Sequence, residues 1–567
     1  MTKEISPLDL PEILLLLSEY LAEDPQSLAS CTRVCRSWHN SLNPFLWRSL
    51  SASKLLSKGQ LSGEAFNKNA QYIRHLQVGK LGREQYPVQH CTNLRTLLLE
   101  DDRKSEWDYI GISNQHLISQ AGSVGGGRNG MKCGDIKDDW RDHVVELILQ
   151  NPGLQKVTVM MERFEPTVEF WSAIQASGGQ GVKELECVFI RIPQGQMESL
   201  LDAFTHIDTL VLQHCTFDIF PLEILDGRRY PCLKSLKLAT NTCLDLTAQI
   251  QLMRCFPELK SLSWSIMGPQ SLPVQDFCDL LSNDCPQIES IVLSDRNLES
   301  DHLARILHAI PRLTRFALRF DTSSSMFNDP EVLRATKRHF ATLKDLEFGQ
   351  VRSNIRAAVV LEILKSCPDM QRLVIYGRLD CSPGGIHAPG IDETDLENTA
   401  VDIPTEPTMT DGSEEQDASW DDTPWACLGL KRLHMIMGAD SQSAWCRHSL
   451  QQQLFLQLGR LTELQTLSLG HCILWMYENA YTHQGLDFTI EAGLSKLAGL
   501  QKLEELNIEG IYQHMGEQDL EWMLGHWPKL RLLEGSLHHK RENLARLDAI
   551  MQERGFKVSN NTYRKLL

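Results

Sequence analysis

A recurring apolar motif limits what this sequence can fold into. It has the form L-x-x-L-x-L, in which another apolar residue can replace Leu, and we find it at fifteen places. The motifs start at Ile73, Leu94, Leu154, Val182, Ile207, Leu233, Leu259, Ile288, Leu313, Leu343, Met370, Leu430, Leu464, Leu503 and Leu530. From Leu154 to Met370 the successive starts are 28, 25, 26, 26, 29, 25, 30 and 27 residues apart. This spacing predicts a stack of repeats.

Proline precedes many of these motifs at a fixed distance. It lies two residues before the first apolar position in seven of the fifteen, although only 23 of the 567 residues are Pro. The seven are Pro152, Pro231, Pro257, Pro286, Pro311, Pro368 and Pro528. Because proline stops a helix and favours extended backbone before it, each one indicates a helix that ends shortly before a strand.

The segments between motifs have the period of amphipathic helices. In Glu299–Ile310 the apolar residues fall at i, i+3, i+4 and i+7, and Val274–Leu281 and Val359–Leu364 are similar. Each unit is therefore predicted to be a short strand, with Leu233, Leu236 and Leu238 as inward residues in one case, followed by a helix.

One such unit cannot cover its own apolar face, so neighbours are expected to stack. The pattern resembles the leucine-rich-repeat family, particularly its longer, cysteine-containing intracellular variety. The asparagine of many such repeats is mostly absent, Asn241 and Asn297 being the nearest cases. The resemblance implies an α/β solenoid with parallel strands on the concave face and helices on the convex face. We place it at residues 73–535, with a C-terminal cap at 536–567 that contains an amphipathic helix over Glu542–Phe556.

Two intervals of 60 residues interrupt the period, which predicts insertions near residues 101–135 and 378–427. The first contains the glycine-rich stretch Gly122–Gly134. The second contains Asp380–Asp422, with 13 acidic residues and no Lys or Arg, so the rest of the chain carries only −4 of the net charge of −17. We expect this acidic segment to be disordered. It is either a solvated tether or a regulatory tail that can be phosphorylated at Thr399, Thr405, Thr408, Thr410 or Ser413.

The first fifty residues do not follow the repeat. Ile13–Leu21 is predicted to be one strongly apolar helix, and Asp24-Pro25 to begin a second that continues to Leu42. Asn43-Pro44 is expected to stop this helix, and a third apolar element to follow over 45–50. Three short helices carry more large apolar side chains than they can bury among themselves, which indicates an interaction surface.

Residue order makes this segment more specific. The series Leu10-Pro11-Glu12-Ile13-Leu14, Tyr20-Leu21, Val34-Cys35-Arg36-Ser37-Trp38 and Leu46-Trp47 is similar to an F-box, with the usual Leu-Pro-x-Glu shortened to Leu-Pro-Glu. The resemblance implies an F-box at residues 1–50, a connecting segment at 51–72, and docking on the Skp-type linker subunit of a cullin-based ubiquitin ligase. It implies that the linker interface is formed or supported by Leu10, Pro11, Ile13, Leu17, Leu21, Leu28, Val34, Cys35, Trp38, Leu46 and Trp47. The alternative is a plain helical cap for the solenoid.

Other short patterns have ordinary explanations. Gly125–Gly130 matches G-x-G-x-x-G without a strand before it, Cys31 and Cys35 fall on a predicted apolar helix face, and His538-His539-Lys540 fits a solvated turn. The sequon at 560–562 has no secretory signal before it. Sixteen cysteines without a CxxC pair favour free thiols in the cytoplasm or nucleus. We therefore propose no catalytic residue, metal or cofactor, and expect no membrane or nucleic-acid partner.

The sequence thus predicts a non-enzymatic adaptor. The N-terminal helices would bind the linker subunit and, through it, a cullin scaffold, while the repeats bind a protein substrate whose identity the sequence does not reveal. The alternative function is a leucine-rich-repeat scaffold or a small-GTPase regulator that has an N-terminal helical cap.

Overall fold

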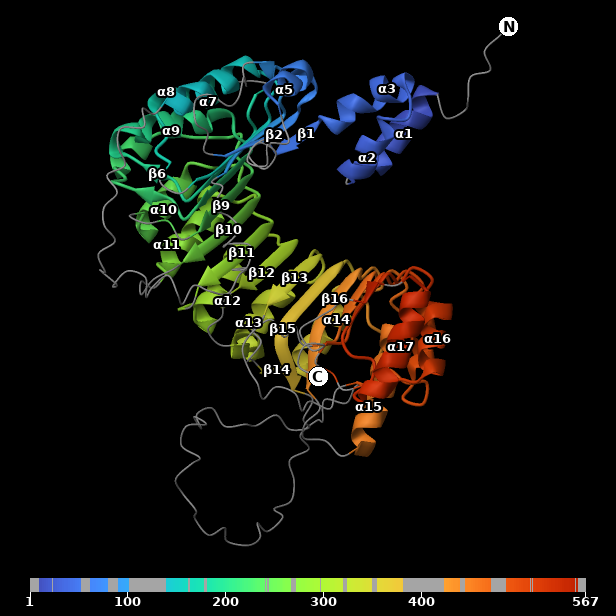
Figure 1. Ribbon diagram of the computed structural model, residues 1–567. Coiled ribbons are helices and arrows are strands. Elements are labelled where there is room, and N and C mark those ends of the chain that lie inside the picture. The colour runs from blue at the N-terminus through green and yellow to red at the C-terminus, as the bar shows by residue number, and fades with distance from the viewer. Residues whose placement is uncertain are drawn as a thin grey trace, which may run out of the picture. The chain divides into compact units, whose positions relative to one another are not determined.

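The computed structural model divides the chain into two compact units, Met1–Ile288 and Glu289–Leu567. In each unit, parallel strands form a sheet whose one face is covered by helices (Figure 1). The described residues are 10–22, 24–51, 62–79, 90–100, 139–161, 164–177, 181–239, 241, 244–266, 272–295, 297–319, 324–348, 354–380, 423–438, 444–470, 486–509, 511, 513–555 and 557–558.

Three helices open the first unit: α1 (Pro11–Tyr20), α2 (Pro25–Cys31) and α3 (Arg36–Leu46). The start of α2 is as predicted. Pro25 is its first residue, and the Asp24 carboxylate accepts hydrogen bonds from the backbone N–H groups of Gln26 and Ser27. The expected single helix from Asp24 to Leu42 is wrong. Cys35 has extended backbone and its Sγ accepts a hydrogen bond from the Trp38 backbone N–H, so α3 begins anew after a turn.

The expectation that Asn43-Pro44 stops the helix is also wrong. α3 continues to Leu46 with Pro44 inside it, and the backbone N–H of Trp47 still donates to the Asn43 carbonyl at 3.1 Å. Pro44 removes only the one hydrogen bond that its own N–H would have donated to the Asn40 carbonyl, and the helix continues past it, as the Trp47 bond shows.

The strands of the first unit pair in parallel in the order β1, β2, β3, β4, β5, β7, β9, β10. Their bounds are β1 (Ser49–Ser51), β2 (His75–Val78), β3 (Thr96–Glu100), β4 (Lys156–Met160), β5 (Glu184–Val188), β7 (Thr209–Gln213), β9 (Ser235–Ala239) and β10 (Ser261–Ile266). A small second sheet pairs β6 (Arg191–Ile192) with β8 (Thr216–Phe217). The helices are α5 (Gly63–Asn69), α7 (Asp139–Gln150), α8 (Val168–Ala176), α9 (Met197–Ala203), α10 (Leu246–Arg254) and α11 (Val274–Asp279). Short helical turns are η2 (Ala70–Tyr72), η5 (Gln194–Gln196), η6 (Phe204–His206), η7 (Leu222–Leu225) and η8 (Leu280–Asp284).

The second unit repeats this plan with parallel strands β11, β12, β13, β15, β16, β17, β18, β19 and β20. Their bounds are β11 (Ser290–Asp295), β12 (Arg315–Arg319), β13 (Asp345–Phe348), β15 (Arg372–Asp380), β16 (Arg432–Gly438), β17 (Thr466–Ser468), β18 (Glu505–Asn507), β19 (Leu532–Glu534) and β20 (Lys557–Val558), and β14 (Asn354–Arg356) pairs with the end of β15. The helices are α12 (Ser300–Ala309), α13 (Pro330–Lys337), α14 (Ala357–Ser366), α15 (Ala444–Leu458), α16 (Glu517–His526) and α17 (Arg541–Glu553), with turns η9 (Ser324–Asn328) and η11 (Leu494–Gly499).

The repeat prediction is confirmed at every motif. Each of the fifteen starting residues is buried and lies two residues before a strand of the sheet, from Ile73 before β2 to Leu530 before β19. Leu236 and Leu238 are buried inside β9 as predicted, and Lys237 between them is exposed. The apolar positions of α12 are buried too, at Leu303, Ile306 and Leu307.

The prolines lie where the sequence places them, between a helix and a strand. α7 ends at Gln150, two residues before Pro152, and α14 ends at Ser366, two residues before Pro368. A backbone ladder then fixes the register of each strand. In the first unit the Asp208 carbonyl accepts hydrogen bonds from the N–H groups of both Lys234 and Ser235, at 2.8 and 3.0 Å, and neighbouring repeats copy this pair.

Asparagine side chains tie repeats together although they do not recur at each motif. Asn241 accepts a hydrogen bond from the Cys215 N–H and donates to the Leu212 carbonyl. Asn151 is 1% exposed; its Oδ1 accepts from the Leu94 N–H at 2.7 Å and its Nδ2 donates to the Cys91 carbonyl at 2.7 Å. It thereby holds the end of α7 to the segment before β3.

Several predicted boundaries differ from the structure. Strand β1 pairs with β2, so the sheet already begins inside the segment assigned to the F-box helices. At the other end, β20 pairs with β19 after α17, so the predicted cap adds one more strand. Trp425 and Cys427 fall within the insertion predicted near residues 378–427, but they are 2% and 0% exposed and belong to the core.

The prediction that His538 lies in a solvated turn is wrong. The residue is buried, because its Nδ1 accepts from the Lys540 N–H and its chain pairs with His514. The glycine-rich stretch Gly122–Gly134, the acidic segment from 381 to 422 with its five hydroxyl residues, and the sequon at 560–562 lie outside the described residues.

We expect Asn151→Ala to lower the free energy of unfolding by about 2–4 kcal/mol, because it leaves a buried N–H and a buried carbonyl unpaired. Leu149→Ala on the same helix, where the side chain is 55% exposed, should change stability by less than about 1 kcal/mol. Denaturant unfolding of both variants checks this, and equal losses would contradict the role given to Asn151.

Acid should destabilise the second unit through His339. Burial, and secondarily the nearby Arg338 and His308, lower the pKa of this imidazole below 6.5, although its hydrogen bond to the Leu307 carbonyl opposes the shift. Because the unfolded chain then binds the proton first, stability is fully present above about pH 6.5 and is lost as the pH falls toward the folded pKa. The melting temperature of His339→Gln should fall less between pH 7 and pH 5 than that of the wild type. His526→Gln, at an exposed position of the same unit, is the control.

Candidate functional site

A small core holds the three N-terminal helices together. Leu14, Leu28 and Leu42, one from each helix, are 1%, 3% and 0% exposed. Five partly buried residues pack around them: Leu21, Cys31, Trp38, Phe45 and Leu46. Loss of one such buried leucine typically costs about 2–5 kcal/mol, so these contacts are enough to position the helices.

The opposite face of α1 is apolar and uncovered. Ile13, Leu16 and Tyr20 are 38%, 61% and 86% exposed, and their spacing of three and four residues places them on one side of the helix. Leu14 and Ser18, both 1% exposed, face the core instead. We call Ile13, Leu16 and Tyr20 the α1 stripe.

Exposed apolar residues concentrate near this stripe in the sequence. Of the 14 large hydrophobic residues exposed in the described part of the chain, six lie between residues 10 and 34. Those six are Leu10, Ile13, Leu15, Leu16, Tyr20 and Val34. Single exposed apolar residues are normal on a protein surface, but such a concentration is typical of an interaction site.

The residues predicted for the linker interface fall into three groups. Those with an exposed side chain are Leu10, Pro11, Ile13, Val34 and Cys35. Those that are half-buried are Leu17, Leu21, Trp38, Leu46 and Trp47. Leu28 is buried in the helical core, so it can support an interface but has no surface with which to form one.

The interface predicted from the sequence lacks the most exposed residues of the α1 stripe. Leu16 and Tyr20 are absent from the predicted interface, as is Leu15 at 46% exposure. A helical projection of residues 10–21 would have found the α1 stripe, because Leu14, Ser18 and Leu21 form the inward side at the same spacing.

Cys31 and Cys35 are separated by the end of α2. Cys31 packs against the helical core as predicted, whereas Cys35 is exposed and caps α3, so its assignment to an apolar helix face is wrong. Because the helix breaks between them, Cys31 faces the helical core and Cys35 faces solvent.

Polar contacts join the helices to the first repeat. The Asn43 Nδ2 of α3 donates to the Asn69 Oδ1 of α5 at 2.8 Å, and the Asn69 Nδ2 donates to the Ala65 carbonyl at 2.9 Å. The chain then passes from α3 through Trp47 and Arg48 directly into β1. The repeats thus fix the end of α3 and leave the α1 stripe open to solvent.

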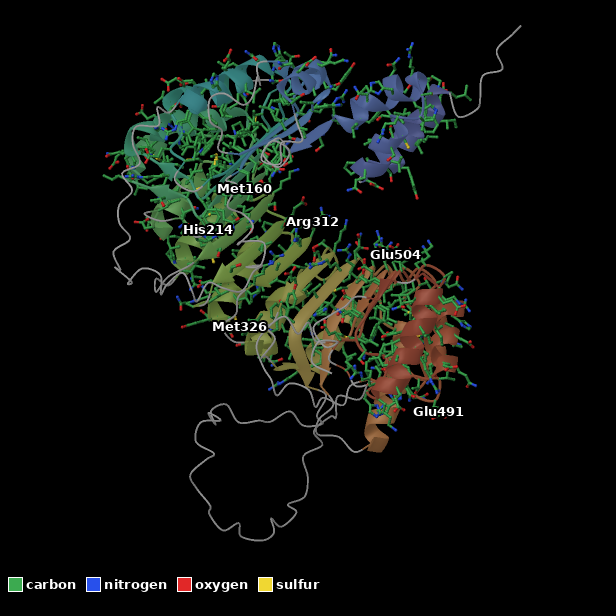
Figure 2. All side chains as sticks on the ribbon, in the orientation of Figure 1. Met160, His214, Arg312, Met326, Glu491 and Glu504 are labelled. Carbon is green, nitrogen blue, oxygen red and sulfur yellow. The ribbon has the colours of Figure 1, made fainter. Side chains whose placement is uncertain are left out.

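Charged side chains on neighbouring strands of the second unit form ion pairs, and Figure 2 draws these side chains on the ribbon. In the second unit, Glu347 is 2% exposed between Arg319 Nε, at 2.9 Å, and Arg372 Nη2, at 2.8 Å. Burial alone would raise the pKa of Glu347, but these two hydrogen bonds outweigh it and lower that pKa. Arg372 also contacts Asp345 at 2.7 Å, so three adjacent strands share one charge network.

The thiols of the described residues are free, and many are unsuited to nucleophilic chemistry. Burial raises the pKa of Cys91, Cys215, Cys285, Cys367 and Cys427 to about 12 in each case. These side chains therefore act as small apolar groups of the core.

Two kinds of site are not found where the structure can be described. No group of three or more His, Cys, Asp or Glu side chains there could hold a metal ion. Within the same residues, every helix is too short or too polar to span a lipid bilayer.

Comparison with known proteins agrees with the N-terminal assignment. The family model described as F-box-like matches residues 9–53. No curated protein sequence matches the chain significantly.

Two solved structures illustrate the fold comparison. An internalin from Listeria monocytogenes is 13% identical, with 87% of this chain and 88% of that chain covered, at a TM-score of 0.28. A chain in the crystal structure of the yeast complex of Rad7 and Elc1 is 10% identical, with 100% of this chain and 100% of that chain covered, at a TM-score of 0.41. The family match assigns an F-box-like domain to residues 9–53, and the strand–helix repeats described above follow it.

Proposed function

We propose that this protein is a substrate-recognition adaptor of a cullin-type ubiquitin ligase. Its F-box-like domain binds the Skp-type linker subunit, and its repeats bind a target protein. The joining of an F-box-like domain to leucine-rich repeats supports an adaptor role in general, because chains of this architecture are generally non-catalytic.

The exposed α1 stripe is the observation that carries the proposal. A side chain of this size gains roughly 1.5–3 kcal/mol when it moves from water into an apolar contact. Leu16 and Tyr20, at 61% and 86% exposure, have this energy still to gain. A helical cap needs a polar outer face, which the stripe does not provide.

Residues of the interface have different roles under this proposal. Ile13, Leu16, Tyr20 and Val34 contact the linker subunit directly, together with Leu10, Pro11 and Cys35 at the helix starts. The half-buried Leu17, Leu21, Trp38, Leu46 and Trp47 contribute an edge to the contact and hold the helices. Leu28 acts only from within the core.

The mechanism is tethering, without chemistry by this chain. A target held by the repeats shares one assembly with the ubiquitin-conjugating enzyme that the cullin recruits. Its lysines then meet the activated ubiquitin at a raised effective concentration. The charged side chains of the strands, with networks such as that around Glu347, suit recognition of a protein surface. Free thiols suit the reducing environment of cytoplasm or nucleus.

Substituting Leu16→Glu and Tyr20→Glu together should abolish capture of a Skp-type linker subunit by the purified full chain. The expected loss of affinity is at least about a hundredfold, because two exposed anchors become charges that the contact would have to desolvate. Both side chains lie outside the helical core, so circular dichroism and the melting temperature should remain those of the wild type.

The matched control is Leu149→Glu with Ile219→Glu, which places the same charges at two exposed apolar positions of the repeats, 55% and 54% exposed. This control should bind the linker subunit normally. If the wild type captures no linker subunit while another F-box protein does, the proposal is wrong. If the Leu16 and Tyr20 variant unfolds the repeats, the helices are a cap.

A further inference from the structure

Three arginines occupy the same position before the first three strands of the sheet. Arg48, Arg74 and Arg95 each directly precede a strand, β1, β2 and β3 in turn. The backbone ladder fixes their order, since the Arg48 carbonyl accepts from the Arg74 N–H at 2.9 Å and the Arg74 carbonyl accepts from the Arg95 N–H at 2.7 Å. Adjacent strands lie about 4.8 Å apart, so the outer two backbones are about 10 Å apart.

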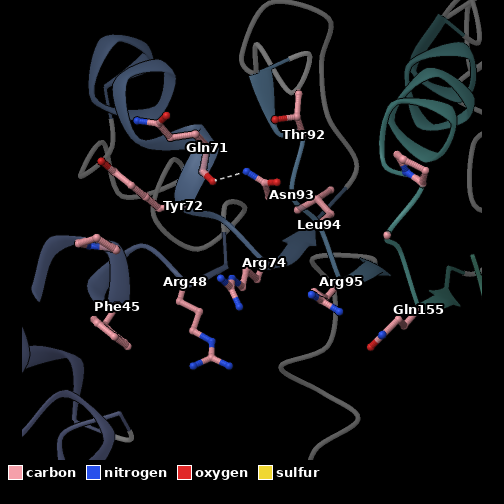
Figure 3. A pocket seen from close by; sticks show the side chains of 13 residues that line it. Phe45, Arg48, Gln71, Tyr72, Arg74, Thr92, Asn93, Leu94, Arg95 and Gln155 are labelled. Atoms are coloured by element: carbon pink, nitrogen blue, oxygen red, sulfur yellow. Dashed lines mark hydrogen bonds between the residues drawn. The ribbon is translucent and has the colours of Figure 1, made fainter. Parts of the chain in front are cut away.

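A cavity of about 590 Å³ lies along this row. Figure 3 shows the three guanidinium groups side by side, with Gln155 as the next member of the row. No Asp or Glu is among the lining residues, which are Pro44, Phe45, Arg48, Gln71, Tyr72, Arg74, Thr92, Asn93, Leu94, Arg95, Pro152, Gly153 and Gln155. The cavity is therefore positively charged and rich in hydrogen-bond donors.

The three guanidinium groups have no carboxylate partner among the described residues. Where arginines of the second unit lie on neighbouring strands, acidic side chains are interleaved with them, as at Arg315, Asp345 and Arg372. Burial lowers the pKa of the neighbouring His75 first, and the positive charges of the row, Arg48, Arg74 and Arg95, also lower it.

We propose that this arginine row binds a phosphomonoester group carried on a serine or threonine of a bound protein. Each guanidinium presents parallel N–H donors that match two phosphate oxygens, and three of them at adjacent strand starts can surround a dianion. Tyr72, Gln71 and Thr92 lie around the same cavity and can donate to the phosphate or to the peptide that carries it.

A nucleic acid fits this site less well than a phosphopeptide does. Gln155 interrupts the row after Arg95. Lys183, Lys234 and Lys260 hold the same position in later repeats, but Asp208 lies between the first two of these lysines. The uninterrupted basic run is therefore the arginine triplet, and the broken row beyond it is not a continuous basic stripe for a polynucleotide backbone. A single phosphate on a peptide needs only the triplet. The identification of that peptide as part of a ubiquitination target rests on the proposed function, whereas the phosphate site itself does not.

The test uses the purified full chain and two bead-bound peptide pools. Both pools are nonapeptides degenerate on either side of a fixed centre, which is phosphoserine in one pool and serine in the other. At physiological salt the phosphoserine pool should retain about tenfold more protein, and Arg48→Gln/Arg74→Gln/Arg95→Gln should remove the difference. The charge-matched control R312Q/K431Q/R432Q in the second unit should keep it. Circular dichroism of both triple variants verifies folding.

A second arm distinguishes protein-borne from free phosphate. Inorganic phosphate at matched ionic strength should raise the melting temperature of the wild type only slightly, and should compete with the phosphoserine pool at millimolar concentration. If phosphate stabilises the wild type while the two pools bind equally, the site takes free phosphate and the peptide proposal is wrong. Equal pools without any phosphate effect overturn the site altogether.

Linker capture separates this inference from the proposed function. The arginine triple variant should still bind the linker subunit, and the Leu16 and Tyr20 variant should still prefer the phosphoserine pool. Preference for phosphoserine without linker capture by the wild type would leave the phosphate site standing and remove the adaptor function. Linker capture by the wild type without a preference for phosphoserine would leave the adaptor function standing and remove the phosphate site.

Discussion

The structure depends on one constraint: a short strand followed by a helix cannot bury its own apolar face. Burial is achieved only when the next repeat adds its strand in parallel, so that leucines of successive strands and helices close a common core. In successive repeats of each unit, the carbonyl before a strand accepts hydrogen bonds from two N–H groups of the following repeat, as at Asp208 and Thr314, and this keeps the stacking in register. Every other feature of the repeats is arranged around that contact.

The same register explains how the sheet can carry sites. Residues at equivalent positions of successive repeats lie about 4.8 Å apart, so a residue type repeated in sequence becomes a row in space. Arg48, Arg74 and Arg95 form one such row, and no Asp or Glu is among the described residues that line its cavity. Arg315, Asp345 and Arg372 form another in which opposite charges alternate and neutralise each other. The residue type at equivalent positions thus decides whether a row has charges of one sign or forms a neutralised network.

The N-terminal helices follow a different rule. Their core is only three leucines with a partly buried rim, and it uses one side of α1. The other side remains apolar and exposed at Ile13, Leu16 and Tyr20. This division lets one side of α1 hold the three helices together while the other side keeps apolar side chains exposed. Attachment through α3, β1 and the Asn43–Asn69 hydrogen bond ties that surface to the repeats without covering it.

The sequence alone determined the repeats, because the apolar period and the prolines act locally: all fifteen motif starts lie two residues before a strand. It also determined the N-terminal domain type, which the match at residues 9–53 supports. Helical periodicity could have separated the two sides of α1, but only the tertiary structure decided which side packs against α2 and α3, where Leu14 is 1% exposed and Leu16 is 61% exposed. The arginine row likewise arises from strand pairing between residues that are 26 and 21 positions apart along the chain. Proximity of that kind depends on which strands stack, and local sequence patterns do not contain it.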